Sequence, residues 1–289
     1  MIRKDQASSL RLLTGSRQRK ADSHPNHFPQ QMMLVVSGKG GVGKSFFSLH
    51  LAQALSARQE RVLLVDSNLM SPNLHVLTNK DPRYPLHHFL QHGRPFGKEA
   101  LVPLQENLDL LGNHAAGSSE PHIANAPYFV ELLQPLATRY DYVVMDTQTG
   151  LNEWNLSLLQ YADLSLLMSI TDPTSVIDTY TFIKASLPYL ATPRFQLVVN
   201  QVIGESSGLE AHNNLNAALS HFLNYRVDLL GMLPLDMEIK RSAVEQKPLW
   251  DVSRNSPVIR TIQEMAKTVR NLLLKKKSCY NTQYQEANV

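Results

Sequence analysis

Short, nearly continuous apolar runs recur along the chain from Met32 onward, and segments with helical spacing of apolar residues separate most of them. The runs show no clean alternation of polar and apolar positions, which is typical of strands buried on both faces of a parallel sheet. We therefore predict a doubly wound α/β fold, with a mostly parallel sheet and helices on both faces. The predicted strands are Met33–Ser37, Val62–Asp66, Leu108–Leu111, Tyr142–Asp146, Leu164–Ile170, Gln196–Asn200 and Leu229–Met232, and the predicted helices include Ser45–Ala57, Tyr128–Tyr140, Asn152–Ala162 and Ser175–Leu187.

The two ends of the chain differ from this pattern. Residues 1–31 are polar and interrupted by proline, which predicts a tail and linker. Near the C-terminus, Pro257 opens an amphipathic helical pattern that ends in three lysines at 275–277. We therefore predict a domain over 32–277 and a polar tail over 278–289. Two roles stay open for the last helix, packing on its own sheet or contacting a membrane surface through its basic end.

Composition narrows the class of protein. The 289 residues are 43% hydrophobic and 18% charged, enough to form a large core. A net charge of +3 is too small to predict a nucleic-acid partner. No apolar stretch is long enough to span a membrane, and the single cysteine, Cys279, excludes a disulfide framework or a thiolate cluster formed by one chain. We expect a cytoplasmic protein.

A glycine-rich loop follows the first predicted strand and precedes a predicted helix. It fits GxxxxGK followed by Ser or Thr, in which backbone N–H groups surround phosphate oxygens. Lys44 would reach the β- and γ-phosphates, and the Ser45 hydroxyl would bind Mg²⁺. The predicted nucleotide-binding residues of this loop are Gly38, Lys39, Gly40, Gly41, Val42, Gly43, Lys44 and Ser45.

Lys39 is a second lysine in this loop, although Lys44 already serves the phosphates of one nucleotide. The sequence from Lys39 to Ser45 resembles the deviant Walker A motif of the MinD/ParA family of ATPases. That resemblance implies ATP as the ligand and an ATP-dependent homodimer, in which Lys39 crosses to the partner's nucleotide. The alternative for Lys39 is a solvated surface charge.

The resemblance to this family extends over about residues 33–275. Arg61–Asp66 resembles its second strand, which ends in an acid, and Tyr142–Asp146 resembles its Walker B strand. Carboxylates at the ends of parallel strands beside a phosphate loop are placed to hold Mg²⁺ through water, so Asp66 and Asp146 are predicted metal residues. For either acid alone, a buried capping role is the alternative. Asn200 resembles the family's adenine-reading asparagine, although strand ends commonly carry asparagine.

Two segments resemble the FlhG (FleN) branch of the family, whose members set the number and place of polar flagella. Asp5–Arg11 matches the branch's DQAxxLR element, and Thr171–Lys184 is similar to its EPTSITDAYxxIK run. The resemblance implies contacts with an FlhF-type GTPase, a FleQ-type activator and flagellar switch proteins, and polar or membrane association with ATP bound. The implied GTPase-binding residues are Asp5, Gln6, Ala7, Leu10 and Arg11. They would lie in a short helix capped by Asp5, in which Leu10 and Leu13 share an apolar face. The alternative is a frayed chain terminus capped by Asp5.

One departure from the family concerns hydrolysis. Asn68 stands where the family has the second aspartate of a DxD pair, and an amide orients water without accepting its proton. We therefore predict ATP binding and dimerisation with slow or absent hydrolysis, with Lys39, Lys44 and Asn68 as the catalytic positions. Gln148 offers another water-orienting side chain. The alternatives are a hydrolysis-deficient, nucleotide-bound scaffold and a ParA/MinD-type ATPase that positions cargo or the division site.

Overall fold

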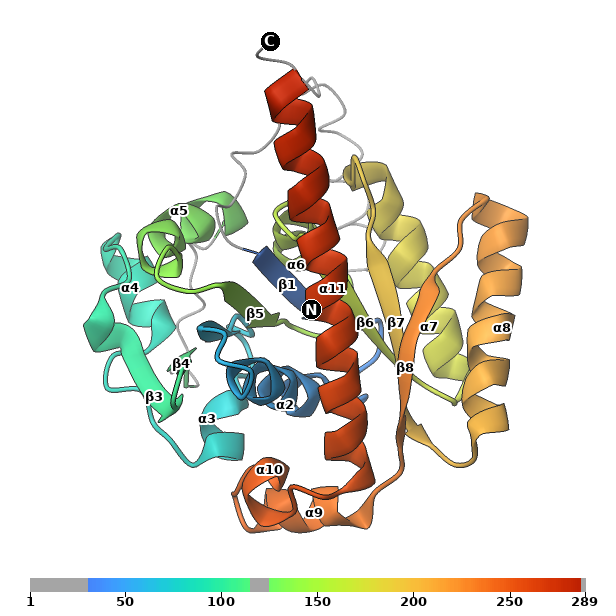
Figure 1. Ribbon diagram of the computed structural model, residues 1–289, viewed down its shortest axis with the longest axis horizontal. Coiled ribbons are helices and arrows are strands. Elements are labelled where there is room, and N and C mark those ends of the chain that lie inside the picture. Colours follow the sequence, from blue (N-terminus) through green and yellow to red (C-terminus); the bar gives the residue numbers. More distant parts are fainter. Residues whose placement is uncertain (1–30, 115–124, 287–289) are drawn as a thin grey trace, which may run out of the picture.

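The computed structural model describes residues 31–114 and 125–286, and an eight-stranded sheet runs through its centre (Figure 1). The strand order is β3-β4-β2-β5-β1-β6-β7-β8, and all pairs among these strands are parallel except β3 with β4. The predicted doubly wound, mostly parallel fold is confirmed. The strands are β1 (Gln31–Val36), β2 (Val62–Asp66), β3 (Leu101–Gln105), β4 (Leu108–Leu111), β5 (Tyr142–Asp146), β6 (Leu164–Ile170), β7 (Phe195–Val202) and β8 (Asp228–Pro234).

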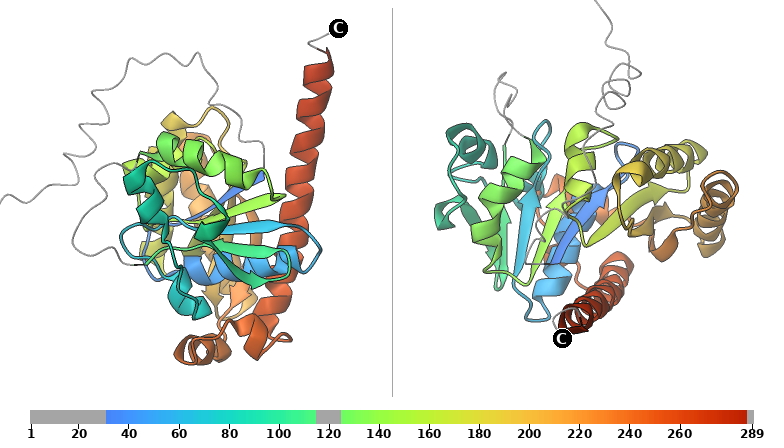
Figure 2. Two further views of the ribbon diagram at one scale, coloured as in Figure 1. Left: turned by 90° about the vertical axis from the view of Figure 1, so that its left-hand side faces the viewer. Right: turned by 90° about the horizontal axis from the view of Figure 1, so that it is seen from above.

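Helices cover both faces of the sheet (Figure 2). One face carries α2 (Lys44–Ser56), α3 (Leu74–Thr78), α9 (Met237–Val244), α10 (Leu249–Val252) and α11 (Pro257–Glu286). The other carries α4 (Leu86–His92), α5 (Ala126–Ala137), α6 (Glu153–Leu159), α7 (Pro173–Ser186) and α8 (Glu205–Leu223). Two 3₁₀ turns, η1 (Lys98–Ala100) and η2 (Leu187–Tyr189), complete the regular structure of the described residues.

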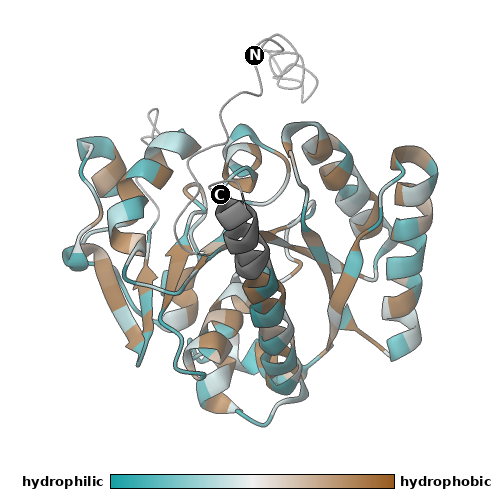
Figure 3. Ribbon diagram, turned by 45° about the horizontal axis from the view of Figure 1, so that its top comes forward, coloured by the Kyte–Doolittle hydropathy of each residue, from teal (hydrophilic) through white to brown (hydrophobic). Residues whose placement is uncertain are grey.

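The continuous apolar runs follow from this two-sided covering. In β1, Met32 and Leu34 pack under the α4–α8 face, whereas Met33 and Val35 pack against α2 and α11. Because successive side chains of a strand point to opposite faces, both sets must be apolar. Figure 3 shows the same pattern as hydrophobic colour along the central strands.

Three features differ from the sequence prediction. Strand β3 was not predicted, because Pro103 interrupts its run; it lies at the edge of the sheet, where proline is tolerated. Helix α8 was also missed. Helix α11 continues to Glu286, beyond the predicted end at Lys277, since residues 278–286 contain neither glycine nor proline. The GTPase-binding residues predicted over 5–11 lie outside the described residues.

Parallel strands bring the functional segments to one edge of the sheet. The phosphate loop follows β1, and the neighbouring strands β2 and β5 end at Asp66 and Asp146, which are register partners. Ligands of open α/β sheets bind at the carboxyl ends of strands, so this edge is the candidate site. Within the described ranges, no helix has the length and apolar character needed to cross a membrane.

Candidate functional site

The phosphate loop runs from β1 into α2 and is packed too closely to accept side chains at two glycines. A Cβ on Gly38 would collide with the backbone carbonyl of Asp178 in α7. Gly43 has φ +91°, and a Cβ there would collide with the Asn200 amide. Glycine is therefore required at both positions by local geometry, and the loop is held against α7 and β7.

Lys44 points inward from the first turn of α2. Its ammonium group donates to Ser37 Oγ at 2.9 Å and to Thr149 Oγ1 at 2.8 Å, and the residue is only 8% exposed. Burial lowers the pKa of Lys44 below its usual value, and the charge of Asp146 partly opposes this shift. A buried cation flanked by hydroxyl groups is suited to binding phosphate oxygens.

Lys39 is engaged elsewhere, at the N-terminus of α7. Its Nζ donates to Thr174 Oγ1 at 2.6 Å and lies 3.5 Å from Asp172 Oδ1, which also caps α7 by accepting from the Thr174 and Ser175 amides. About a third of the Lys39 side chain is exposed. The two lysines of the loop therefore have separate partners, and Lys44 itself is buried whereas Lys39 is partly exposed.

Asp146, at the end of β5, carries a buried oxygen without a hydrogen bond. Its Oδ1 accepts from Ser48 at 3.2 Å, whereas Oδ2 has no partner among the described residues. Burial raises the pKa of Asp146 to about 6, against the lowering effect of Ser45, Lys44 and Ser48. An unpartnered buried carboxylate oxygen fits the water shell of Mg²⁺, so Ser45 and Asp146 are suited to hold that ion.

Asp66 is also fully buried, but its oxygens are occupied. Oδ2 accepts from the backbone amides of Asn73 and Leu74, at 3.1 and 3.0 Å, and Oδ1 accepts from the Asn68 amide at 3.3 Å. Burial, followed by the charge of Asp146, raises the pKa of Asp66 well above its usual value. The structure thus shows the capping role at the start of α3, and the role in Mg²⁺ binding stays a prediction.

The Asn68 side chain is turned back onto its own loop. Its Nδ2 donates to the Ser71 carbonyl at 2.5 Å, and its Oδ1 accepts from the Ser71 amide at 3.0 Å. Both ends of the amide are therefore used locally. This geometry agrees with a residue that contributes little to activating water.

Asn200 ties β7 to the phosphate loop. Its Nδ2 donates to the Val42 carbonyl at 2.9 Å, and its Oδ1 accepts from the Gln201 amide at 2.8 Å. Gln201, which has φ +57°, donates from its side chain to the Gly41 carbonyl at 3.4 Å. Asn200 therefore has a structural role in shaping the loop, and its reading of adenine stays a prediction.

Asn155 is a site residue that sequence reasoning missed. It lies in α6, is fully buried, and donates through Nδ2 to the carbonyls of Gln148 and Gly150, at 2.9 and 2.8 Å. The Gly150 amide in turn donates to the Ser37 carbonyl at 2.9 Å. The only sequence signal is a polar residue within an otherwise apolar helical face.

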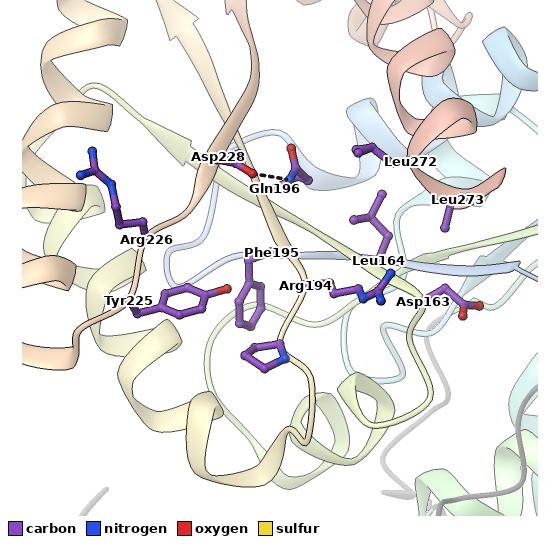
Figure 4. A pocket seen from close by; sticks show the side chains of 11 residues that line it. Asp163, Leu164, Arg194, Phe195, Gln196, Tyr225, Arg226, Asp228, Leu272 and Leu273 are labelled. Atoms are coloured by element: carbon purple, nitrogen blue, oxygen red, sulfur yellow. Dashed lines mark hydrogen bonds between the residues drawn. The ribbon is translucent and has the colours of Figure 1, made fainter. Parts of the chain in front are cut away.

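A cavity of about 300 Å³ lies away from this site, at the amino ends of β6, β7 and β8 (Figure 4). Its walls include Leu164, Arg194, Phe195, Tyr225 and Leu272. Because the phosphate loop is at the opposite ends of these strands, the cavity takes no part in the candidate chemistry. In the part of the chain that the structure describes, no group of three or more His, Cys, Asp or Glu is placed to hold a metal ion directly.

The chain is similar to known proteins over most of its length. The ParA family model, described as "NUBPL iron-transfer P-loop NTPase", matches residues 29–270. The antiactivator FleN of Pseudomonas aeruginosa is 25% identical over 83% of this chain and 86% of its own length. The flagellum site-determining protein YlxH of Helicobacter pylori is 24% identical over 82% and 80%, respectively.

A solved structure shows the same fold. The septum site-determining protein MinD of Pyrococcus horikoshii, complexed with Mg-ADP, superposes with a TM-score of 0.66 at 21% identity, over 83% of this chain and 96% of MinD. The family match covers most of the chain, including the phosphate loop, the two strand-end acids and the sheet that positions them. The chain therefore belongs to the ParA/MinD family of P-loop NTPases.

Proposed function

We propose that this chain is an ATP-dependent switch that binds Mg-ATP and dimerises through it. The observation that carries the proposal is the separation of the two loop lysines. Lys44 is buried beside the phosphate loop, whereas Lys39 lies at the surface, bonded to exposed groups of α7. An inward lysine serves a nucleotide in its own subunit, and an outward lysine is available to a nucleotide on another subunit.

Mg²⁺ is the cation we propose for the site, because it prefers oxygen ligands and retains much of its water. Ser45 would bind it directly, and Asp146 through water. When bound, the ion would neutralise charge on the β- and γ-phosphates. The Mg-ADP complex of the P. horikoshii relative supports this choice.

We propose that hydrolysis is slow, because Asn68 cannot accept a proton from water and is held by Ser71. Asn68→Asp should raise Mg-ATP turnover at least tenfold. The introduced carboxylate would lose the bond to the Ser71 carbonyl, which leaves one oxygen free to accept a proton from water. Phosphate release from purified protein measures this, with the exposed Asn79→Asp as a charge-matched control. Equal and rapid turnover by the wild type and Asn68→Asp would refute slow hydrolysis.

The biological role we propose is regulation of flagellar number and placement, as in the FlhG (FleN) branch. The names of FleN and YlxH support it, together with the sequence runs Asp5–Arg11 and Thr171–Lys184. Partners would be an FlhF-type GTPase, a FleQ-type activator and flagellar switch proteins. The family description mentions iron transfer, but this chain has one cysteine, so a regulator fits its residues better than a cluster carrier.

The N-terminal segment offers a direct test of this role. Wild-type protein should accelerate GTP hydrolysis by an FlhF-type GTPase, and Leu10→Asp should abolish the acceleration because Leu10 lies on the apolar face of the predicted helix. Leu12→Asp, off that face, is the matched control. Equal acceleration by the wild type and Leu10→Asp would contradict the assignment of this segment.

A further inference from the structure

Thr149 contacts the candidate site, although the sequence did not predict this contact. It lies in the loop after β5, three residues beyond Asp146, and its hydroxyl accepts from Lys44 Nζ at 2.8 Å. Its methyl group also lies 3.7 Å from where a Cβ on Gly40 would be, so the side chain borders the phosphate loop. Thr149 therefore contacts both the cation and the edge of the phosphate-binding loop.

The backbone on either side of Thr149 is fixed. The buried Asn155 side chain donates to the carbonyls of Gln148 and Gly150, which flank Thr149 in the sequence. Gly150, at φ +82°, donates its amide to the Ser37 carbonyl at the end of β1. The turn is thus preorganised, which leaves the exposed Thr149 side chain as its adjustable part.

The direction of Thr149 indicates which phosphate it would meet. The loop amides surround the inner phosphates, and the P-loop lysine extends to the β- and γ-phosphates. Thr149 comes from a neighbouring strand rather than from the loop, and it reaches Lys44 at the tip of that lysine's side chain. Two partners of one ammonium nitrogen lie about 4 to 5 Å apart, so a rotation of the side chain brings the hydroxyl to a phosphate oxygen bound by Lys44.

We propose that Thr149 is a γ-phosphate-specific binding residue, whose hydroxyl donates to a terminal phosphate oxygen and so favours ATP over ADP. The inference rests on the proposed function, because it assumes that nucleotide phosphates bind at Lys44. Through Thr149, the presence or absence of a γ-phosphate would act on the loop that follows β5, the strand that ends at Asp146. Asn155 and Gly150 act as positioning residues, since they fix the backbone from which the hydroxyl is presented.

The test compares affinities for two nucleotides rather than turnover. Isothermal titration calorimetry in Mg²⁺ measures binding of ADP and of the slowly hydrolysed analogue ATPγS. Thr149→Val, which removes the hydroxyl at nearly constant shape, should weaken ATPγS binding about tenfold, as expected for a lost hydrogen bond to a charged group. ADP affinity should change less than twofold. Thr149→Ser should restore the preference, and Thr268→Val, on the outer face of α11, should leave both affinities unchanged.

The outcomes separate the γ-phosphate role of Thr149 from the proposed binding of nucleotide at Lys44. Thr149→Val could weaken the binding of ATPγS and of ADP equally, or leave both unchanged. Either result would show that the γ-phosphate role of Thr149 is wrong while nucleotide binding stands. Failure of Thr149→Ser to restore the preference would also overturn it. If the wild type binds neither nucleotide, the proposed function fails and the inference fails with it. Should Thr149→Val prove too unstable to measure, Thr149→Ala gives the same comparison without a branched side chain.

Discussion

Lys44→Met is expected to weaken Mg-ATP binding at least 100-fold. The substitution keeps an unbranched side chain of similar volume but removes a buried ammonium group that would contact phosphate oxygens. Charge-assisted hydrogen bonds contribute about 1.5 to 3 kcal/mol each, and about 1.4 kcal/mol corresponds to a tenfold change in affinity. Calorimetric titration with Mg-ATPγS measures the loss.

The same variant should remain folded. Burial lowers the pKa of Lys44 and so disfavours its charged form, and Met fills a similar volume without a charge. Thermal unfolding should therefore show a shift of only a few degrees. Lys98→Met, at an exposed lysine of η1, is the matched control and should bind as the wild type does. Binding by Lys44→Met within threefold of wild type would place the nucleotide elsewhere.

Lys39→Ala is expected to abolish ATP-dependent dimerisation while leaving the affinity for Mg-ADP, which does not drive dimerisation, within about threefold of wild type. Its described contacts are with exposed groups of α7, so their loss should cost the fold little. The trans contact, by contrast, would place an unscreened cation beside the partner's phosphates. Sedimentation velocity with Mg-ATP, combined with calorimetry on the same preparation, separates the two effects.

The control for this experiment is Lys98→Ala, which removes an exposed lysine remote from the loop. It should dimerise as the wild type does. A Lys39→Ala protein that still dimerises with Mg-ATP would show that Lys39 is only a surface charge. Loss of both binding and dimerisation would show that Lys39 serves the nucleotide of its own subunit.

Much of the fold follows from local sequence. β2, β4, β5 and β6 begin and end where their apolar runs predict, because strands covered on both faces must be apolar throughout. The phosphate loop is equally predictable from the sequence, since its glycines are required by backbone conformation and close packing. Helix α11 shows the limit of this reasoning, because its polar last turns remain helical without any apolar pattern to predict them.

Only part of the candidate site can be predicted from the sequence. Lys44 and Asp146 stand at fixed places relative to a strand and its loop, so their neighbourhood was predictable. The contacts of Asn68, Asn155 and Thr149 depend instead on how loops from different strands fold against one another. A single amide hydrogen-bonds equally well to any nearby carbonyl, so its partner is set by tertiary structure rather than by sequence pattern.

The proposed ATP-dependent dimer can be detected from the mass of the wild-type protein in the presence of different nucleotides. Sedimentation at one protein concentration should give 32.5 kDa, the mass of a single chain, under three conditions. These are no nucleotide, Mg-ADP, and ATP plus EDTA. With Mg-ATP, or with Mg-ATPγS to exclude slow turnover, the protein should have twice that mass. Saturated binding of Mg-ATPγS without any change in mass would contradict an ATP-dependent dimer.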